Sequence, residues 1–471
     1  MHNSDKVSAV GFRIAFGGKY GMIQKMIFVE KGGGSGLKKW KYKPKGLFRE
    51  VYAEMIFSAE SLRINARAIF FALGVGMVVG VIGGFFSRLL GLSDVFRNNV
   101  SWSIFLLPLV GLLIVWLYKK GGIKTAGGTD IVIQAARGEQ PVSRLLAPVI
   151  FAATLLTHFF GGSAGREGAA LQLGGSLAEV VRHLFRLGDE FEDLAVMCGM
   201  SAGFSAVFGN QISAVIFALE ISCVGMLPMG AFLPCVVSSI VAGEVAQLLG
   251  GHAVVFSLAS SPEDFLFFTR VLILAVLCGL LSILVCYTFA GVRQFLERLF
   301  PNPYLRVVVG GCVVVLLTLL LNTRYYLGSG QALIDQSIGQ GKALPWDFAL
   351  KMLLTAITLG AGFKGGEIVP AFAIGASFGC VMGPLLGLDP SYAAAIGMVA
   401  VFCGVTNCPL TSLVLGFEVF SFCNPEGFLV AVAASFLVSG YSGLYAKQKF
   451  AFSKVADSTG TVADEENINY K

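Results

Sequence analysis

A carboxylate stands inside a run of small residues in GGSAGREGAALQLGG (161–175), where Glu167 follows Arg166. A glycine-rich break followed by a helix leaves several backbone N–H groups unpaired at the positive end of the helix dipole. Such a helix end binds anions without needing a buried cation. The amides around Glu167 and Gly168 would be the donors, so this segment predicts an anion-binding helix terminus.

Two further segments share this design. In GFKGGEIVPAFAIG (362–375) the donors would be the amides of Ile368 and Val369. In KTAGGTDIVIQAA (124–136) they would lie near Thr129, whose hydroxyl adds another donor. Three such termini that converge would form a site for a small anion.

Glu167 can itself occupy such a site, because an ionised carboxylate is an anion. Its protonation would release it, so one residue could serve as gate and proton carrier. The alternative is a structural ion pair with Arg166, but adjacent side chains on a helix do not face each other, which favours the functional interpretation. Glu367 lies next to the matching position in the second segment. It is either a second coupling carboxylate or the partner of Lys364.

A phenol hydroxyl is a neutral donor suited to an anion, and two tyrosines are candidates for this role. Tyr445, in GYSGLYAKQ (440–448), is the first choice, and Tyr441 is the competitor. No cofactor or metal is expected, because the ten cysteines lie mostly in apolar stretches without a CxxC pair.

The elements that must position these residues are membrane helices. The chain is 55% hydrophobic and only 14% charged, and charge-free stretches that can each span a bilayer occupy 68–87, 98–118, 145–165 and 271–292. Other apolar stretches are interrupted by glycine, proline or serine, which indicates broken and half-spanning helices. We therefore expect an all-α polytopic membrane protein with roughly ten to fourteen such helices.

The chain also repeats itself weakly. Residues 198–220 match 397–418 at an offset of 418 − 220 = 198, and residues 165–176 match 366–377 at 366 − 165 = 201. Duplicated glycine-interrupted segments are typical of a transport site at the bilayer midplane. The matched positions include Gly165 with Gly366, Gly174 with Gly375, Gly199 with Gly397, and Glu220 with Glu418. The last two end matched helices, where each is expected to make a structural hydrogen bond to a loop.

Basic residues gather before the first span, in GLKKWKYKPKGLFRE (36–50). In that place they follow the positive-inside rule and do not indicate nucleic acid, so both termini are expected in the cytoplasm. The predicted organisation is a cytoplasmic N-terminal segment 1–66, flexible over 1–47, a transport domain 67–449 with halves of about 67–255 and 256–449, and a short polar tail 450–471.

These motifs resemble the CLC family of chloride channels and anion/proton antiporters. GREG (165–168) with LQLGGSLAE (171–179) is similar to the gating-glutamate motif, and AGGTDIV (126–132) and GGEIVPAFAIGASFG (365–379) are similar to anion-binding loops. The resemblance implies inverted repeats and a homodimer with one pore per subunit. It also implies that Glu167 is the external gating glutamate, that Thr129 replaces the anion-contacting serine, and that Tyr445 is the central tyrosine.

The chain departs from the family's pattern at Ile221, where many chloride/proton antiporters carry an internal proton-transfer glutamate. Glu367 is instead similar to the fluoride/proton antiporter branch, whereas the Thr129 hydroxyl is closer to the chloride transporters. The short tail lacks regulatory CBS domains, which indicates a bacterial inner membrane.

The sequence therefore predicts transport of a small halide, chloride or fluoride, in exchange for protons. A passive channel is the nearest alternative. An intramembrane enzyme, with Ser329 as nucleophile and His158 or His183 as base, is a remote one. An ATP-driven pump is disfavoured, because the chain has no GxxxxGK[ST] motif.

Overall fold

The computed structural model describes residues 47–123, 128–251, 254–258 and 264–454, with side chains from residue 66 onward. The chain divides into two units, 1–59 and 60–471; the first contributes the opening turns of α1, and the second holds every other described element. Most of the segment predicted to be flexible, and the tail beyond residue 454, lie outside the described residues.

The described elements of the first half are helices, short 3-10 turns and one short strand. Its elements are α1 (Leu47–Asn99), the 3-10 turn η1 (Ser101–Leu106), α2 (Leu107–Lys120), α3 (Asp130–Ala135), α4 (Leu146–Phe159), α5 (Glu167–Leu184), η2 (Asp189–Phe191), α6 (Glu192–Phe208), α7 (Gln211–Glu220), β1 (Cys223–Val224), η3 (Met229–Ala231) and α8 (Phe232–Leu248). Helix α1 continues across residue 66, the predicted end of the N-terminal segment, because no glycine or proline interrupts residues 47–67.

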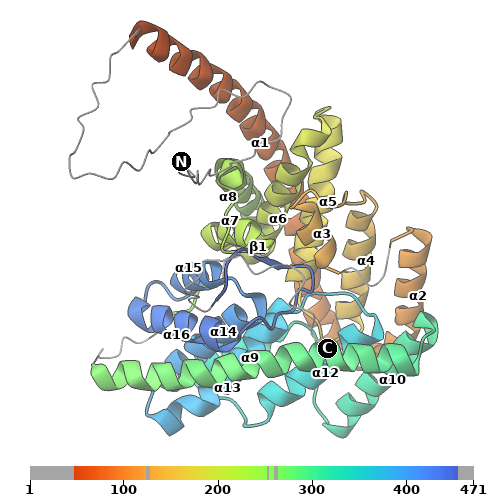
Figure 1. Cartoon of the computed structure of the whole chain (residues 1–471). Coiled ribbons are helices and arrows are strands. Elements are labelled where there is room, and N and C mark those ends of the chain that lie inside the picture. Colours follow the sequence, from red (N-terminus) through yellow and green to blue (C-terminus); the bar gives the residue numbers. More distant parts are fainter. Residues whose placement is uncertain (1–46, 124–127, 252–253, 259–263, 455–471) are drawn as a thin grey trace, which may run out of the picture. The chain divides into compact units, whose positions relative to one another are not determined.

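The second half has the same character, and its long helix α9 crosses the view in Figure 1 and packs on α12, α14 and α16. Its elements are α9 (Phe265–Leu299), α10 (Pro303–Leu320), α11 (Gln331–Gly339), α12 (Asp347–Ala361), α13 (Ile368–Leu386), α14 (Pro390–Thr406), α15 (Pro409–Val419), α16 (Pro425–Val438) and β2 (Lys449–Phe450). The two strands form a small parallel ladder in which Cys223 pairs with Lys449.

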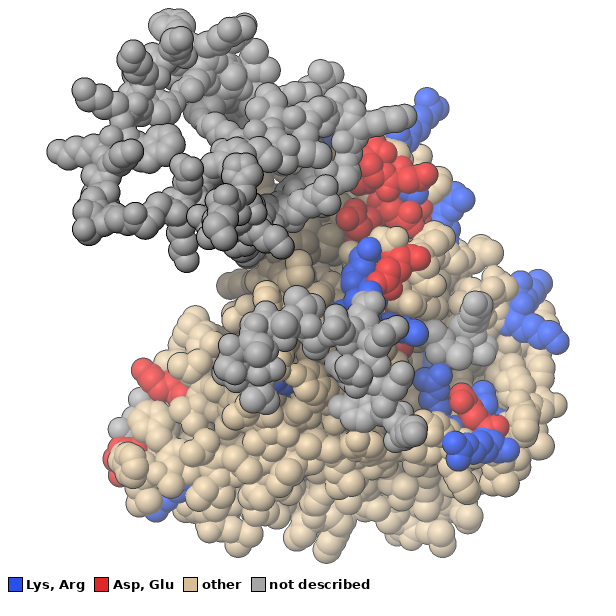
Figure 2. Space-filling model, viewed as in Figure 1, with Lys and Arg blue, Asp and Glu red and all other residues tan. Residues whose placement is uncertain are grey.

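Seven of the described helices are long and apolar enough to cross a membrane, and five shorter apolar helices accompany them. Figure 2 shows broad uncharged areas between a few clusters of charged side chains. The predicted all-α, multi-pass architecture with half-spanning helices is confirmed.

The sequence repeat appears as repeated packing. Gly174 of α5 meets Gly199 of α6 so closely that a Cβ on either would run into the other's backbone. The matched residues Gly375 of α13 and Gly397 of α14 make the same contact in the second half. Each glycine pair lets two helix backbones approach, as small residues do in membrane helix pairs.

The breaks before α5 and α13 are also equivalent. Helices α4 and α12 are followed by Gly161 and Gly362, whose φ angles are +87° and +113°. Glycine adopts these angles without a Cβ penalty, so both helices stop there and the chain turns into a short extended segment. Their offset, 362 − 161 = 201, equals that of the anion-site motifs.

Candidate functional site

The two extended segments meet at a single antiparallel bridge. Gly165 N donates to Gly366 O, and Gly366 N donates to Gly165 O, each at 2.7 Å. Helices α5 and α13 begin just beyond, at Glu167 and Ile368. The two predicted anion-binding termini, one from each half, therefore converge.

Only glycine fits at this crossing. A Cβ on Gly366 would lie 2.7 Å from Gly168 N and 2.9 Å from Glu167 N, both of which are backbone atoms. We predict that Gly366→Ala lowers the free energy of unfolding by about 1–3 kcal/mol, the usual cost of overpacking, and sharply reduces anion flux. Thermal unfolding and liposome flux measure these effects.

Gly91→Ala is the matched control, because a methyl group added at Gly91 in α1 meets nothing within 4 Å. It should leave both quantities near wild type. Equal flux through both variants would contradict the close crossing.

Glu167 is the first residue of α5, and its side chain is fully buried. Its Oε2 accepts from Val369 N of α13 at 3.0 Å and from Arg166 N at 3.1 Å. Oε1 has no hydrogen-bond partner among the described residues. A carboxylate oxygen thus stands where the sequence places an anion, at the N-terminal end of α13.

Arg166 is only loosely paired with this carboxylate. Its Nε lies 3.9 Å from Glu167 Oε1, and its guanidinium stacks over the Phe208 ring at 5.4 Å. The simple ion-pair interpretation of Glu167 therefore does not describe its main contact, which is the α13 amide.

Thr129 brings the third predicted segment to the same place. A Cβ on Gly168 would lie 2.8 Å from Thr129 Oγ1 and 3.2 Å from Gly366 Cα. The hydroxyl makes no capping bond to α3, which has only six residues. Val369 therefore binds the Glu167 carboxylate, Thr129 and Gly168 lie beside the glycine crossing, and Ile368 begins the helix whose amide holds Glu167.

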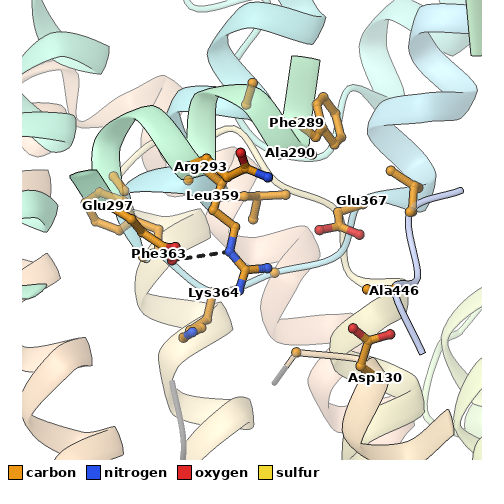
Figure 3. A pocket seen from close by; sticks show the side chains of 18 of the residues that line it. Asp130, Phe289, Ala290, Arg293, Glu297, Leu359, Phe363, Lys364, Glu367 and Ala446 are labelled. Carbon is orange, nitrogen blue, oxygen red and sulfur yellow. Dashed lines mark hydrogen bonds and ion pairs between the residues drawn. The ribbon is translucent and has the colours of Figure 1, made fainter. Parts of the chain in front are cut away.

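Glu367 faces a different space. It lines a cavity of 470 Å³ together with Asp130, Arg293, Glu297 and Arg306. Figure 3 shows Glu367 at one end of this cavity, beyond the Arg293–Glu297 ion pair of 3.3 Å.

Lys364, also in the cavity wall, holds its Nζ 4.6 Å from the centre of the Tyr118 ring. No ion pair joins it to Glu367 in the part of the chain that the structure describes. The cavity opens onto Glu367, whereas Glu167 is fully buried and is not among the residues that line the cavity.

Tyr445 is buried, and its neighbours Leu444 and Ala446 line the cavity beside Glu367. The Tyr441 hydroxyl instead lies 3.1 Å from Ser453 Oγ and accepts from Lys454 N at 3.2 Å. Of the two tyrosines, Tyr445 therefore remains the better candidate for the anion-binding phenol, because the Tyr441 hydroxyl is already bound to Ser453 and Lys454.

The segment that carries Tyr445 is fixed to the start of α3 and to the loop that follows this helix. Lys447 N donates to Asp130 Oδ1 at 3.1 Å, and Glu139 pairs with Lys449 at 3.2 Å and with Arg137 at 2.8 Å. Arg137 foremost, and then Lys449, lower the pKa of Glu139 to about 2, so the clamp stays charged at neutral pH.

Glu220 and Glu418 have structural roles, but they bind helix ends and not loops. Glu220 accepts from Leu410 N and Thr411 N of α15, at 3.0 and 2.8 Å. Glu418 reciprocates with Ile212 N and Ser213 N of α7, both at 2.8 Å. Each carboxylate caps the matched helix of the other half, where it complements the helix dipole. Ile221, next to Glu220, is fully buried and offers no proton-carrying group.

The geometry does not assemble the hydrolytic site considered as a remote alternative. Ser329 Oγ accepts from Gln331 N at 3.4 Å. His158 Nδ1 lies 2.9 Å from Thr154 O, and His183 Nδ1 lies 3.1 Å from Glu179. Within the described ranges, neither histidine hydrogen-bonds to the serine.

Sequence reasoning missed a pair of threonines. Ser163 N donates to Thr358 Oγ1, and Lys364 N donates to Thr157 Oγ1, each at 3.2 Å. The threonine offset, 358 − 157 = 201, equals the repeat offset, so extending the alignment upstream would have found them.

Comparisons with known proteins identify the family of the chain. The sequence model of one family, described as "Voltage gated chloride channel", matches residues 110–440. A "Chloride/fluoride channel protein" of Pseudomonas syringae pv. tomato is 35% identical over 393 residues, which cover 81% of this chain and 86% of the relative.

Two solved structures extend the likeness to three dimensions. A CLC-type fluoride/proton antiporter is 32% identical, with a TM-score of 0.79 over 82% of this chain and 98% of that one. A slow cyanobacterial Cl⁻/H⁺ antiporter is 19% identical, with a TM-score of 0.69 over 79% of this chain and 94% of that one. At this identity the likeness shows only a shared fold. The chain belongs to the voltage-gated chloride channel, or CLC, family, whose members span the membrane many times.

Proposed function

We propose that this protein exchanges fluoride for protons across a membrane. The observation that carries the proposal is the Glu167 carboxylate, fully buried and hydrogen-bonded to Val369 N at the N terminus of α13. A halide and this carboxylate compete for the same donors, so the anion enters only when the carboxylate leaves.

Protonation is the step that releases Glu167. An ionised carboxylate is held by the Val369 amide and the helix dipole, and a neutral carboxylic acid loses most of that attraction. Halide and proton therefore replace each other at one place, which couples their movements in opposite directions.

Glu367 supplies the proton from the cavity. It lies next to Gly366, whose Cα approaches Gly168, and it opens onto the 470 Å³ space. Water in a cavity of this size can carry protons to Glu367. Glu367 thus performs the internal proton transfer, for which Ile221 has no ionisable group.

Fluoride is the preferred substrate in this proposal. The relatives named for fluoride are 35% and 32% identical to this chain, and the Cl⁻/H⁺ antiporter structure is 19% identical. Glu367 and Ile221 favour the same branch. Because fluoride holds its water strongly, its site needs several strong donors, and the amides of Ile368 and Val369 are suited to that task. The Thr129 hydroxyl, the feature closer to the chloride transporters, would add a further donor.

We further propose a homodimer in a bacterial inner membrane, with both termini cytoplasmic. The positive charges before the first span and at Lys447, Lys449 and Lys454 support this orientation. The proposed transport domain is 67–449, between the N-terminal segment and the short tail.

The test is flux from liposomes that contain only the purified protein and no ATP. We expect fluoride to leave much faster than chloride, as measured with ion-selective electrodes. Faster chloride efflux would assign the protein to chloride exchange, and flux of neither halide would overturn anion transport.

A further inference from the structure

Lys351 of α12 is a buried lysine that the proposed transport mechanism does not use. Its side chain is fully buried, and Nζ donates to Ser163 Oγ, Tyr326 O and Gly328 O at 3.0, 3.1 and 2.7 Å. All three ammonium donors are thus satisfied. No carboxylate of the described residues lies within ion-pair distance of Nζ. A charge buried without a counter-ion is costly, and these hydrogen bonds are what compensate it.

The contacts of Lys351 hold the segment that leads to Glu167. Ser163 stands two residues before the glycine crossing and four before Glu167. The same face of α12 also binds Ser163 through Thr355 Oγ1, at 3.0 Å from Ser163 Oγ, and through Thr358 Oγ1, which accepts from Ser163 N. One ammonium and two hydroxyls therefore fix this segment to α12.

The internal repeat shows which part of this clamp is special. The threonine bond recurs in the other half, where Thr157 accepts from Lys364 N. The position matched to Lys351 is 351 − 201 = 150, which is Ile150. The fold therefore needs the threonine on both sides, but the ammonium clamp is built only on the side that carries Glu167.

We propose that Lys351 is a positioning residue that keeps proton and halide movement coupled. It holds residues 161–165 against α12, so that the Glu167 carboxylate reaches Val369 N and leaves it only when protonated. This inference rests on the proposed antiport function. Without the ammonium, three buried acceptors lose a donor, the segment loosens, and the ionised carboxylate leaves its seat. A halide can then pass without a proton.

The experiment measures protons moved per fluoride ion in proteoliposomes for wild type, Lys351→Met and Lys351→Arg. Methionine has a similar length without charge or donors. In Lys351→Met we expect the fraction of molecules with a misplaced Glu167 carboxylate to rise about tenfold, which is the change that losing one charge-assisted hydrogen bond produces. The proton-to-fluoride ratio should therefore fall several-fold. Arginine should restore part of the ratio. Lys342→Met is the matched control, because Lys342 is exposed on a loop before α12.

The outcomes separate this inference from the proposed function. A wild type that moves no protons with fluoride overturns antiport itself. A coupled wild type with an unchanged ratio in Lys351→Met, even at a lower rate, overturns the role of Lys351, because a merely structural lysine lowers the rate alone. If Lys351→Met does not fold, Ser163→Ala removes one acceptor and keeps the lysine. A lower ratio in that variant supports the clamp, and an unchanged ratio refutes it.

Discussion

Glu167→Gln abolishes the proton movement that accompanies fluoride flux, down to the leak of protein-free liposomes. Glutamine has almost the shape of glutamate and can still accept from Val369 N, which binds the carboxylate at 3.0 Å. It cannot take up and release a proton, so the exchange step has no carrier. An internal pH dye and a fluoride electrode, read together, measure both ions.

Glu426→Gln is the control for this variant. Glu426 is an exposed residue in the first turn of α16, so the same chemical change there should leave both fluxes near wild type. Wild-type proton movement in Glu167→Gln would show that another group carries the proton.

Glu367→Gln reduces proton flux by about 100-fold, the lower range of what a positioned acid–base group contributes. Glu367 is the carboxylate of the 470 Å³ cavity that stands next to the glycine crossing, and glutamine cannot pass protons from that cavity to Glu167. Coupled fluoride efflux should fall with it. The same dye and electrode measure the effect, with Glu426→Gln again as control.

Two results would contradict this role for Glu367. Normal proton flux in Glu367→Gln would mean that protons bypass the cavity. If Glu367→Gln lowered the unfolding temperature enough to account for the loss of flux, Glu367 would be a structural residue.

Much of this site could be predicted from the sequence, because its chemistry is local. The glycine breaks, the helices that follow them and the carboxylate at the first helical position all lie within segments of about fifteen residues. The repeat offset of 201 then indicates that the two segments are equivalent. An anion at a helix terminus follows from backbone chemistry alone.

The contacts that sequence reasoning missed join distant segments. Lys351 and Ser163 are 188 residues apart, and no periodicity shows that α12 lies against the segment before α5. The partners of Glu220 and Glu418 lie 190 to 206 residues away, so the helix ends that they cap could not be identified. The cavity beside Glu367 likewise depends on Arg293 and Arg306, from two helices that only the fold brings together.

In the proposed mechanism, fluoride and protons move in opposite directions in one coupled cycle. The most direct measurement loads liposomes with fluoride at equal internal and external pH, and holds the membrane voltage at zero with potassium and valinomycin. Under coupled exchange, protons enter as fluoride leaves, so the interior becomes acidic. Simple leakage of hydrogen fluoride makes it alkaline, so the sign of the change distinguishes the two. Fluoride efflux through the protein without internal acidification would contradict the claim.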